Sequence, residues 1–251
     1  MSYGTIVNGL ERLGIQKMQL HLDTYIDLVN KGEKTFAQAL EELISIEEQS
    51  LRERAINACV RVANFPFLKG IDDFEFNFEP NINKTEILDL ASLRFLEKNE
   101  NILLVGTSDV EKTHLATALG IEAAKNRVST YFITFEALMS QLKKALVENR
   151  LESKMKQYTK YKLLIIDEIG YLPIDKDSAN LFFQLIAKRY EKHSTIITTN
   201  TVFSKWGDIF GSAMLANAIL DRLLHHSVVI SIKGPSCRLR EKQELLEKRN
   251  G

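Results

Sequence analysis

The sequence predicts an α/β fold, with a parallel sheet covered by helices on both faces and a small all-helical region before it. Residues 1–64 contain no proline and carry helical spacing of apolar side chains. From residue 102 onward, short apolar runs alternate with helical patterns. These runs are almost continuously apolar, which is typical of parallel strands buried on both faces. The chain therefore divides into an expected helical bundle at residues 1–66 and an α/β domain at residues 67–251.

The N-terminal region is expected to form three or four short helices. Gly32 is a predicted helix stop, and Thr35 and Gln38 have the spacing of a capping box. Ser50 and Glu53 repeat that spacing and suggest a further helix start. Two interpretations remain open for this bundle: a purely structural cap, or a module that docks DNA or a partner.

The segment after Pro66 connects the two regions. Phe65-Pro66 should end the preceding helix. Phe74, Phe76 and Phe78 alternate with other residues and suggest an edge strand or an extended segment. A helix is expected over Lys84–Leu96. Strands are then predicted at residues 102–105, 130–134, 162–167, 194–199 and 228–232, and helices after residue 113 and at 136–150, 152–161, 177–192 and 215–225.

A phosphate-binding pattern follows the first predicted strand. Gly106, Lys112 and Thr113 match the template G-x-x-x-x-G-K-[ST], and Glu111 stands where the template has its second glycine. Backbone N–H groups at a helix N-terminus, together with a lysine, bind phosphate oxygens. Lys112 would hold the β- and γ-phosphates, and the Thr113 hydroxyl would ligate Mg²⁺. The remaining candidate nucleotide contacts are Thr107, Ser108, Asp109, Val110, Glu111 and His114.

Polar residues end two later strands. Asp167 and Glu168 follow four apolar residues, where Asp167 can hold Mg²⁺ and Glu168 can activate an attacking water. Asn200 ends the strand at 194–199 and could place a neutral donor beside the γ-phosphate. Arg222, on a mostly apolar helix, could stabilise charge on a transferred phosphoryl group, or could simply pair with an acidic side chain. Arg238 and Arg240 are further candidates.

The charge is balanced overall but uneven along the chain. The protein has 33 basic and 33 acidic residues, so a polyanion would have to meet a local patch. Spaced lysines suit phosphate contacts without sequence reading, and Tyr158 and Tyr161 could stack on bases. A solvated helix face is the alternative. The candidate DNA contacts are Lys143, Lys144, Arg150, Lys154, Lys156 and Lys160, followed by Lys162.

Several classes of protein are disfavoured. No apolar run approaches the length of a membrane span, and the first residues lack the pattern of a signal peptide. Cys59 and Cys237 lie far apart without metal-ligand spacing, which favours idle thiols in a reducing cytoplasm. His114, His225, His226 and Trp206 have no catalytic or metal spacing either, and are interpreted as structural or interfacial.

These motifs together resemble the IstB family, the helper ATPases of an insertion-sequence transposase, related to the helicase loader DnaC and the initiator DnaA. The resemblance covers essentially the whole chain. The stretches that carry it are F-P-F-L-K-G, R-F-L-E-K-N-E-N-I-L-L-V-G, K-T-H-L-A, I-I-D-E-I-G-Y-L-P, T-T-N, D-R-L-L and G-P-S-C-R-L-R.

The resemblance implies an AAA+ P-loop core that uses ATP and Mg²⁺ and lacks a full C-terminal lid. Lys112 and Thr113 would be the Walker A residues, Asp167 and Glu168 the Walker B pair, and Asn200 the first sensor. Arg222 would be an arginine finger that reaches a neighbouring subunit, with Arg238 as a second nucleotide-responsive arginine.

The implied partners are duplex DNA, bound without marked sequence preference, a cognate transposase and further copies of the chain in a ring or spiral. A helicase loader and a non-hydrolysing DNA scaffold are the alternative functions. Glu111 departs from the family's glycine. If that position needs positive φ, a non-glycine residue costs about 1–2 kcal/mol. Carboxylate–phosphate repulsion adds to that cost unless the side chain points to solvent. We therefore expect weakened, but not abolished, ATP binding.

Overall fold

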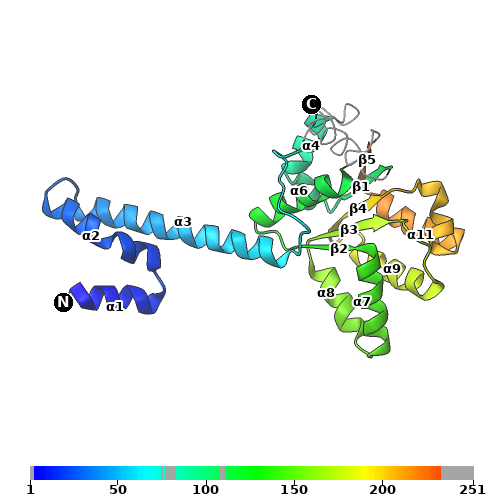
Figure 1. The fold of residues 1–251 in the computed structure, drawn as a ribbon, viewed down its shortest axis with the longest axis horizontal. Coiled ribbons are helices and arrows are strands. Elements are labelled where there is room, and N and C mark those ends of the chain that lie inside the picture. Colours follow the sequence, from blue (N-terminus) through cyan, green and yellow to red (C-terminus); the bar gives the residue numbers. More distant parts are fainter. Residues whose placement is uncertain (1–2, 75, 77–82, 108–110, 233–251) are drawn as a thin grey trace, which may run out of the picture. The chain divides into compact units, whose positions relative to one another are not determined.

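The computed structural model describes residues 3–74, 76, 83–107 and 111–232. It divides into two compact units, Met1–Ala58 and Cys59–Gly251, so the division falls somewhat before the boundary expected at residue 66. Figure 1 shows the helical first unit and the α/β second unit. No helix in the described part of the chain is long and apolar enough to cross a membrane.

The first unit is helical, as expected, but its third helix is one long element. It contains α1 (Tyr3–Leu13), α2 (Gln16–Asn30) and the first part of α3 (Phe36–Val62). The predicted capping box begins α3, because the Thr35 N–H donates to Gln38 Oε1 and the Gln38 N–H donates to Thr35 Oγ1. The predicted helix start at Ser50 and Glu53 is wrong, since both residues lie inside α3.

A buried glutamate on α3 stabilises the start of α2. The Glu47 carboxylate accepts hydrogen bonds from the backbone N–H groups of Lys17 and Met18, at 2.7 and 3.0 Å. Arg54 also contacts this carboxylate at 2.8 Å. Unpaired N–H groups and the helix dipole both favour an anion at a helix N-terminus. Glu47 therefore acts as a capping residue supplied by another helix.

The second unit is built on a five-stranded sheet in which each strand is parallel to its neighbours. The strand order is β2-β3-β4-β1-β5. Thus β4 lies between β1, which leads into the phosphate-binding pattern, and β3, which ends near Asp167. The strands are β1 (Asn101–Gly106), β2 (Thr130–Thr134), β3 (Leu163–Ile169), β4 (Ser194–Thr199) and β5 (Ser227–Ile232).

Helices cover both faces of the sheet, which explains why the strands are apolar at nearly every position. In β1, Ile102 and Leu104 belong to the core beneath α6 and α4, whereas Leu103 faces the core beneath α7, α9 and α11 (Figure 1). The helices are α4 (Lys84–Ala91), α5 (Arg94–Glu97), α6 (Lys112–Lys125), α7 (Phe135–Val147), α8 (Leu151–Lys160), α9 (Lys176–Arg189), α10 (Trp206–Phe210) and α11 (Ala213–Leu224), with a 3₁₀ turn η2 (Phe203–Lys205).

Two local predictions differ from the structure. Phe74 and Phe76 lie in no strand, so the edge-strand alternative is wrong for these residues. Phe74 is a buried core residue that packs against His114, and Phe78 lies outside the described residues. The helix expected over Lys84–Leu96 is split into α4 and α5, because Leu93 adopts a left-handed conformation with φ 65°.

Arg189 at the end of α9 is a buried structural residue with only 1% of its surface exposed. Its guanidinium donates to the carbonyl oxygens of Tyr158 and Tyr161 at 2.8 Å, to the Ser194 carbonyl and to Thr195 Oγ1. Burial lowers the pKa of Arg189 to about 9. The side chain therefore joins the end of α8 to the beginning of β4.

We expect Arg189→Met to destabilise the second unit by about 3 kcal/mol or more, because buried carbonyl acceptors would lose their donor. Denaturant unfolding measures this loss. The matched control is Arg94→Met, since the Arg94 side chain is 71% exposed and its ion pair with Asp89 spans 3.5 Å. Equal losses in the two variants would contradict the anchoring role of Arg189.

Candidate functional site

The centre of the candidate site is the carboxylate of Asp167, a residue with only 3% of its surface exposed. The Thr113 hydroxyl from α6 lies 3.0 Å from both carboxylate oxygens, and the Thr198 hydroxyl from β4 donates to Oδ1 at 2.5 Å. Burial raises the pKa of Asp167, while these two hydrogen bonds act to lower it. Nearby Glu168 also raises this pKa, and Lys112 opposes the rise.

A local distortion turns the next residue outward. Glu168 has φ 65° and is exposed, and the β3–β4 register is irregular between Ile166 and Ile169. The Glu168 N–H donates to Thr198 Oγ1 at 2.8 Å. A non-glycine residue in this conformation stores strain, and strained residues cluster at active sites. The two adjacent acids therefore have different environments, with Asp167 buried and Glu168 available to solvent.

Lys112 and Thr113 occupy the first turn of α6, immediately after the phosphate-binding pattern. Lys112 is buried, and its Nζ donates to the carbonyl oxygen of Thr107 at 2.5 Å. Gly106 ends β1. Ser108, Asp109 and Val110 lie outside the described residues. The structure thus brings Lys112 and Thr113 from one predicted motif together with Asp167 from another.

Glu111 adopts the left-handed conformation that glycine would adopt without strain. Its φ and ψ are 50° and 19°, and it precedes α6 without forming a side-chain cap. Its carboxylate lies 3.5 Å from Nδ1 of His114. The other ring nitrogen of His114 lies 3.2 Å from the carbonyl oxygen of Gly70. Since a carbonyl oxygen only accepts, this Nε2 carries a proton, and His114 links the helix start to the preceding segment.

Asn200 directly follows β4, between the ends of β1 and β3 in the sheet order. Its Oδ1 accepts a hydrogen bond from Thr201 at 2.9 Å. Thr198, two residues earlier, was missed by the sequence analysis as a site residue. Only the strand register could have indicated it, because that register places the end of β4 beside the end of β3.

Arg222 lies on α11, near the end of the sheet where the strands begin and far from Lys112 and Asp167. The neighbouring Leu223 carbonyl accepts from the side chain of Asn101, the first residue of β1. The guanidinium of Arg222 stacks over Phe183 at 4.6 Å and donates to the Ala218 carbonyl. In the described part of the chain it has no acidic partner within ion-pair distance, so the alternative interpretation as a salt bridge is wrong for these residues. Arg238 lies outside the described residues.

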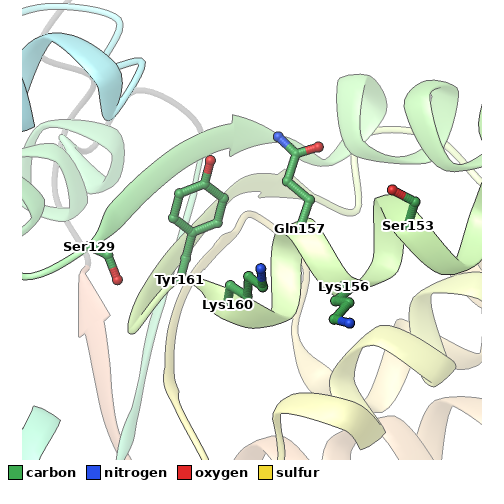
Figure 2. A pocket seen from close by; sticks show the side chains of 6 residues that line it. All are labelled: Ser129, Ser153, Lys156, Gln157, Lys160 and Tyr161. Carbon is green, nitrogen blue, oxygen red and sulfur yellow. The ribbon is translucent and has the colours of Figure 1, made fainter.

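The basic stretch forms the outer surface of α7 and α8. Lys156 and Lys160 on α8 line a cavity of about 470 Å³ together with Ser129, Ser153, Gln157 and Tyr161 (Figure 2). Lys144, Arg150 and Lys154 line a neighbouring cavity of about 360 Å³. Lys143 is paired with Asp175, and Arg150 with Glu148.

The expected stacking by Tyr158 is wrong. This residue is fully buried, and its hydroxyl donates to Gln141 at 2.6 Å. Burial raises its pKa well above the ordinary value. Tyr161 is partly buried and stacks on Tyr131, with ring centroids 4.9 Å apart. The outer surface of α8 therefore offers cations without a free Tyr158 ring.

Comparison with known proteins identifies the family. The model of the IstB-like ATP binding proteins matches residues 8–245. The chain belongs to this family. It is 52% identical to the ATP-binding protein of insertion sequence IS232 from Bacillus thuringiensis subsp. berliner, over 96% of each chain. It is 40% identical to the corresponding protein of IS21 from Pseudomonas aeruginosa, over 94% of this chain and 89% of that one.

Solved structures have a similar fold. The DnaC helicase loader matches with a TM-score of 0.56 and 22% identity, over 65% of this chain and 96% of that chain. The initiator DnaA bound to AMPPCP and single-stranded DNA matches with a TM-score of 0.55 and 17% identity, over 72% and 55% of the two chains. At these identities the likeness concerns the fold alone.

We expect Asp167→Asn to stabilise the unliganded protein near neutral pH. The raised pKa means that the folded chain binds a proton more readily than the unfolded chain does. The stability from this proton is complete below the ordinary pKa and is lost as the pH rises through the raised one. Neutral asparagine avoids the loss.

Melting temperatures at about pH 7 and about pH 4 measure this effect. The gain of Asp167→Asn over the natural chain should be larger at the higher pH. A gain that is equal at both pH values, or a loss at the higher one, would contradict the assignment of a buried, disfavoured charge at Asp167.

Proposed function

We propose that this chain is an ATPase that assembles on duplex DNA and assists the transposase of its insertion sequence. One observation carries the proposal: the Thr113 hydroxyl and the Asp167 carboxylate, from separate motifs, meet within 3.0 Å beside Lys112. The insertion-sequence relatives support the role in transposition.

The residues present fit a magnesium–nucleotide complex. The Thr113 hydroxyl lies within 3.0 Å of both Asp167 carboxylate oxygens, and Mg²⁺ prefers oxygen ligands. Mg²⁺ supplies charge neutralisation at the phosphates when bound. Lys112 holds phosphate oxygens, Glu168 orients and deprotonates the attacking water, and Asn200 donates a hydrogen bond near the γ-phosphate.

Arg222 is proposed to act on the nucleotide of a neighbouring subunit. In its own chain it lies beside the beginning of β1, while Lys112 and Asp167 lie near the strand ends. A strand of this length spans about 17 Å at about 3.3 Å per residue. An arginine side chain does not cover that distance, so a complete site would need two subunits. This supports a head-to-tail ring or spiral.

Duplex DNA is proposed to lie along α7 and α8. Lys144, Lys156 and Lys160 are exposed, whereas Lys143 and Arg150 already have acidic partners. Lysines arranged around an open cavity suit contacts to the phosphate backbone, which are independent of base sequence. Lys154 lies 5.1 Å from the Tyr158 ring and completes this surface.

Mixing two inactive variants tests the shared site. Arg222→Ala lacks the proposed arginine, and Glu168→Gln lacks the proposed catalytic carboxylate. A mixture brings the intact Glu168 of one subunit to the intact Arg222 of another, so DNA-stimulated phosphate release should recover partly. No recovery, with both variants still binding ATP and assembling on DNA, would contradict the intersubunit assignment.

Glu111 is expected to weaken ATP binding through its backbone conformation and its charge. Glu111→Gly removes both effects, whereas Glu111→Gln removes only the charge. Nucleotide titration should therefore give the tightest binding for the glycine variant, an intermediate affinity for the glutamine variant and the weakest for the natural chain. Equal affinities for all three proteins would contradict the expectation that Glu111 weakens ATP binding. An absence of phosphate release by Glu111→Gly would favour a non-hydrolysing scaffold.

Lys156→Ala with Lys160→Ala should weaken duplex DNA binding and make its salt dependence shallower by about two units of slope. Binding titrations across a series of salt concentrations measure both quantities. Lys34→Ala with Lys125→Ala is the matched control, because both lysines are paired with glutamates. Equal effects of the two double variants would place the DNA elsewhere.

The partner distinguishes transposition from replication. We expect a pull-down with the natural chain to recover the cognate transposase. Recovery of a replicative helicase and no transposase would instead make the chain a helicase loader.

A further inference from the structure

Three side chains that the proposed nucleotide site does not use lie close together at the end of the sheet where β4 and β5 begin. Glu191 lies in the loop between α9 and β4, His225 caps α11, and His226 precedes β5. Their ligand atoms all lie within 4.8 Å of one another, and all three residues are exposed. His226 Nε2 is 3.7 Å and His225 Nδ1 is 3.8 Å from the same Glu191 oxygen.

We propose that Glu191, His225 and His226 form a zinc site. Two imidazoles and one carboxylate are a common set of protein ligands for Zn²⁺, with water in the remaining position. Around a tetrahedral zinc, bonds of about 2.0–2.1 Å separate the ligand atoms by about 3.4 Å. The two nitrogen–oxygen distances, 3.7 and 3.8 Å, are slightly longer than this separation, and all three ligand atoms lie within 4.8 Å of one another.

The backbone holds each of the three residues in place. Glu191 has φ 58°, and its carbonyl accepts from Asn99 Nδ2 at 3.1 Å. The His226 carbonyl accepts from the Asn101 N–H at 2.8 Å, and the His225 N–H donates to the Asp221 carbonyl at 3.1 Å. A ligand set whose backbone is already positioned loses less conformational freedom when the metal binds.

The Tyr190 side chain interacts with two of the proposed ligands, His225 and Glu191, and competes with the metal. The Tyr190 hydroxyl lies 2.7 Å from His225 Nδ1, the atom that faces Glu191. Zinc would replace this hydrogen bond. The sequence alone did not indicate the site, because the glutamate is far from the histidine pair in the chain and only the fold brings them together. The bound metal would join the end of α11, which carries Arg222, to the loop before β4.

Calorimetric titration of the full chain with ZnCl₂ tests the proposal. Cys59→Ser and Cys237→Ser form the background, so that thiolates do not contribute. One equivalent of zinc should bind, and Glu191→Gln or His226→Ala should each weaken binding by about tenfold or more. His193→Ala is the matched control from the same loop and should leave binding unchanged.

Co²⁺ gives a second, spectroscopic measurement. Absorption bands of nitrogen- and oxygen-coordinated cobalt should appear when Glu191, His225 and His226 are all present and should be lost in His226→Ala. The melting temperatures of the two metal-free proteins should be the same. Absence of stoichiometric zinc binding would overturn the proposal, and so would binding that is equal in Glu191→Gln, His226→Ala and the His193→Ala control.

Discussion

The buried carboxylate of Asp167 is the constraint on which the site depends. A charge with so little exposure requires polar partners, and Thr113 and Thr198 supply them from α6 and β4. These bonds fix the beginning of α6 against the end of β3. The raised pKa of Asp167 indicates that the unliganded site remains electrostatically costly. A cation at this point would offset that cost, so the proposed Mg²⁺ binding would also stabilise the fold.

The order of the strands separates two groups of functional residues. Because β4 lies between β1 and β3, Asn200 at the end of β4 lies between Gly106, which ends β1, and the acids Asp167 and Glu168 near the end of β3. Arg222 lies near the beginning of the strands instead. The two halves of the proposed site therefore lie at opposite ends of the parallel strands. Neighbouring copies arranged head to tail would bring these two ends together, so activity and assembly would depend on each other.

Much of the fold follows from the sequence, because strands covered on both faces must be apolar throughout. Residues 130–134 and 194–199 were predicted with the bounds that the structure has. Other features depend on contacts between distant residues. Ser50 and Glu53 have capping-box spacing, yet a helix interior accommodates the same pattern. Thr198, Arg189 and Glu47 are ordinary residues in the sequence, and only the packing of other elements gives them their roles.

The departure at Glu111 concerns the same site. The backbone there has the left-handed conformation that favours glycine, and the carboxylate is directed at His114. Because Lys112, Thr113 and Asp167 remain in place, we expect nucleotide binding to be weakened but not abolished.

The most direct test of this account is the Mg²⁺ dependence of ATP binding. Titrations with and without Mg²⁺ should show tighter binding with the metal in the natural chain, and little difference in Thr113→Val, whose hydroxyl is absent. Equal effects of Mg²⁺ in both chains would contradict the role assigned to Thr113 and Asp167.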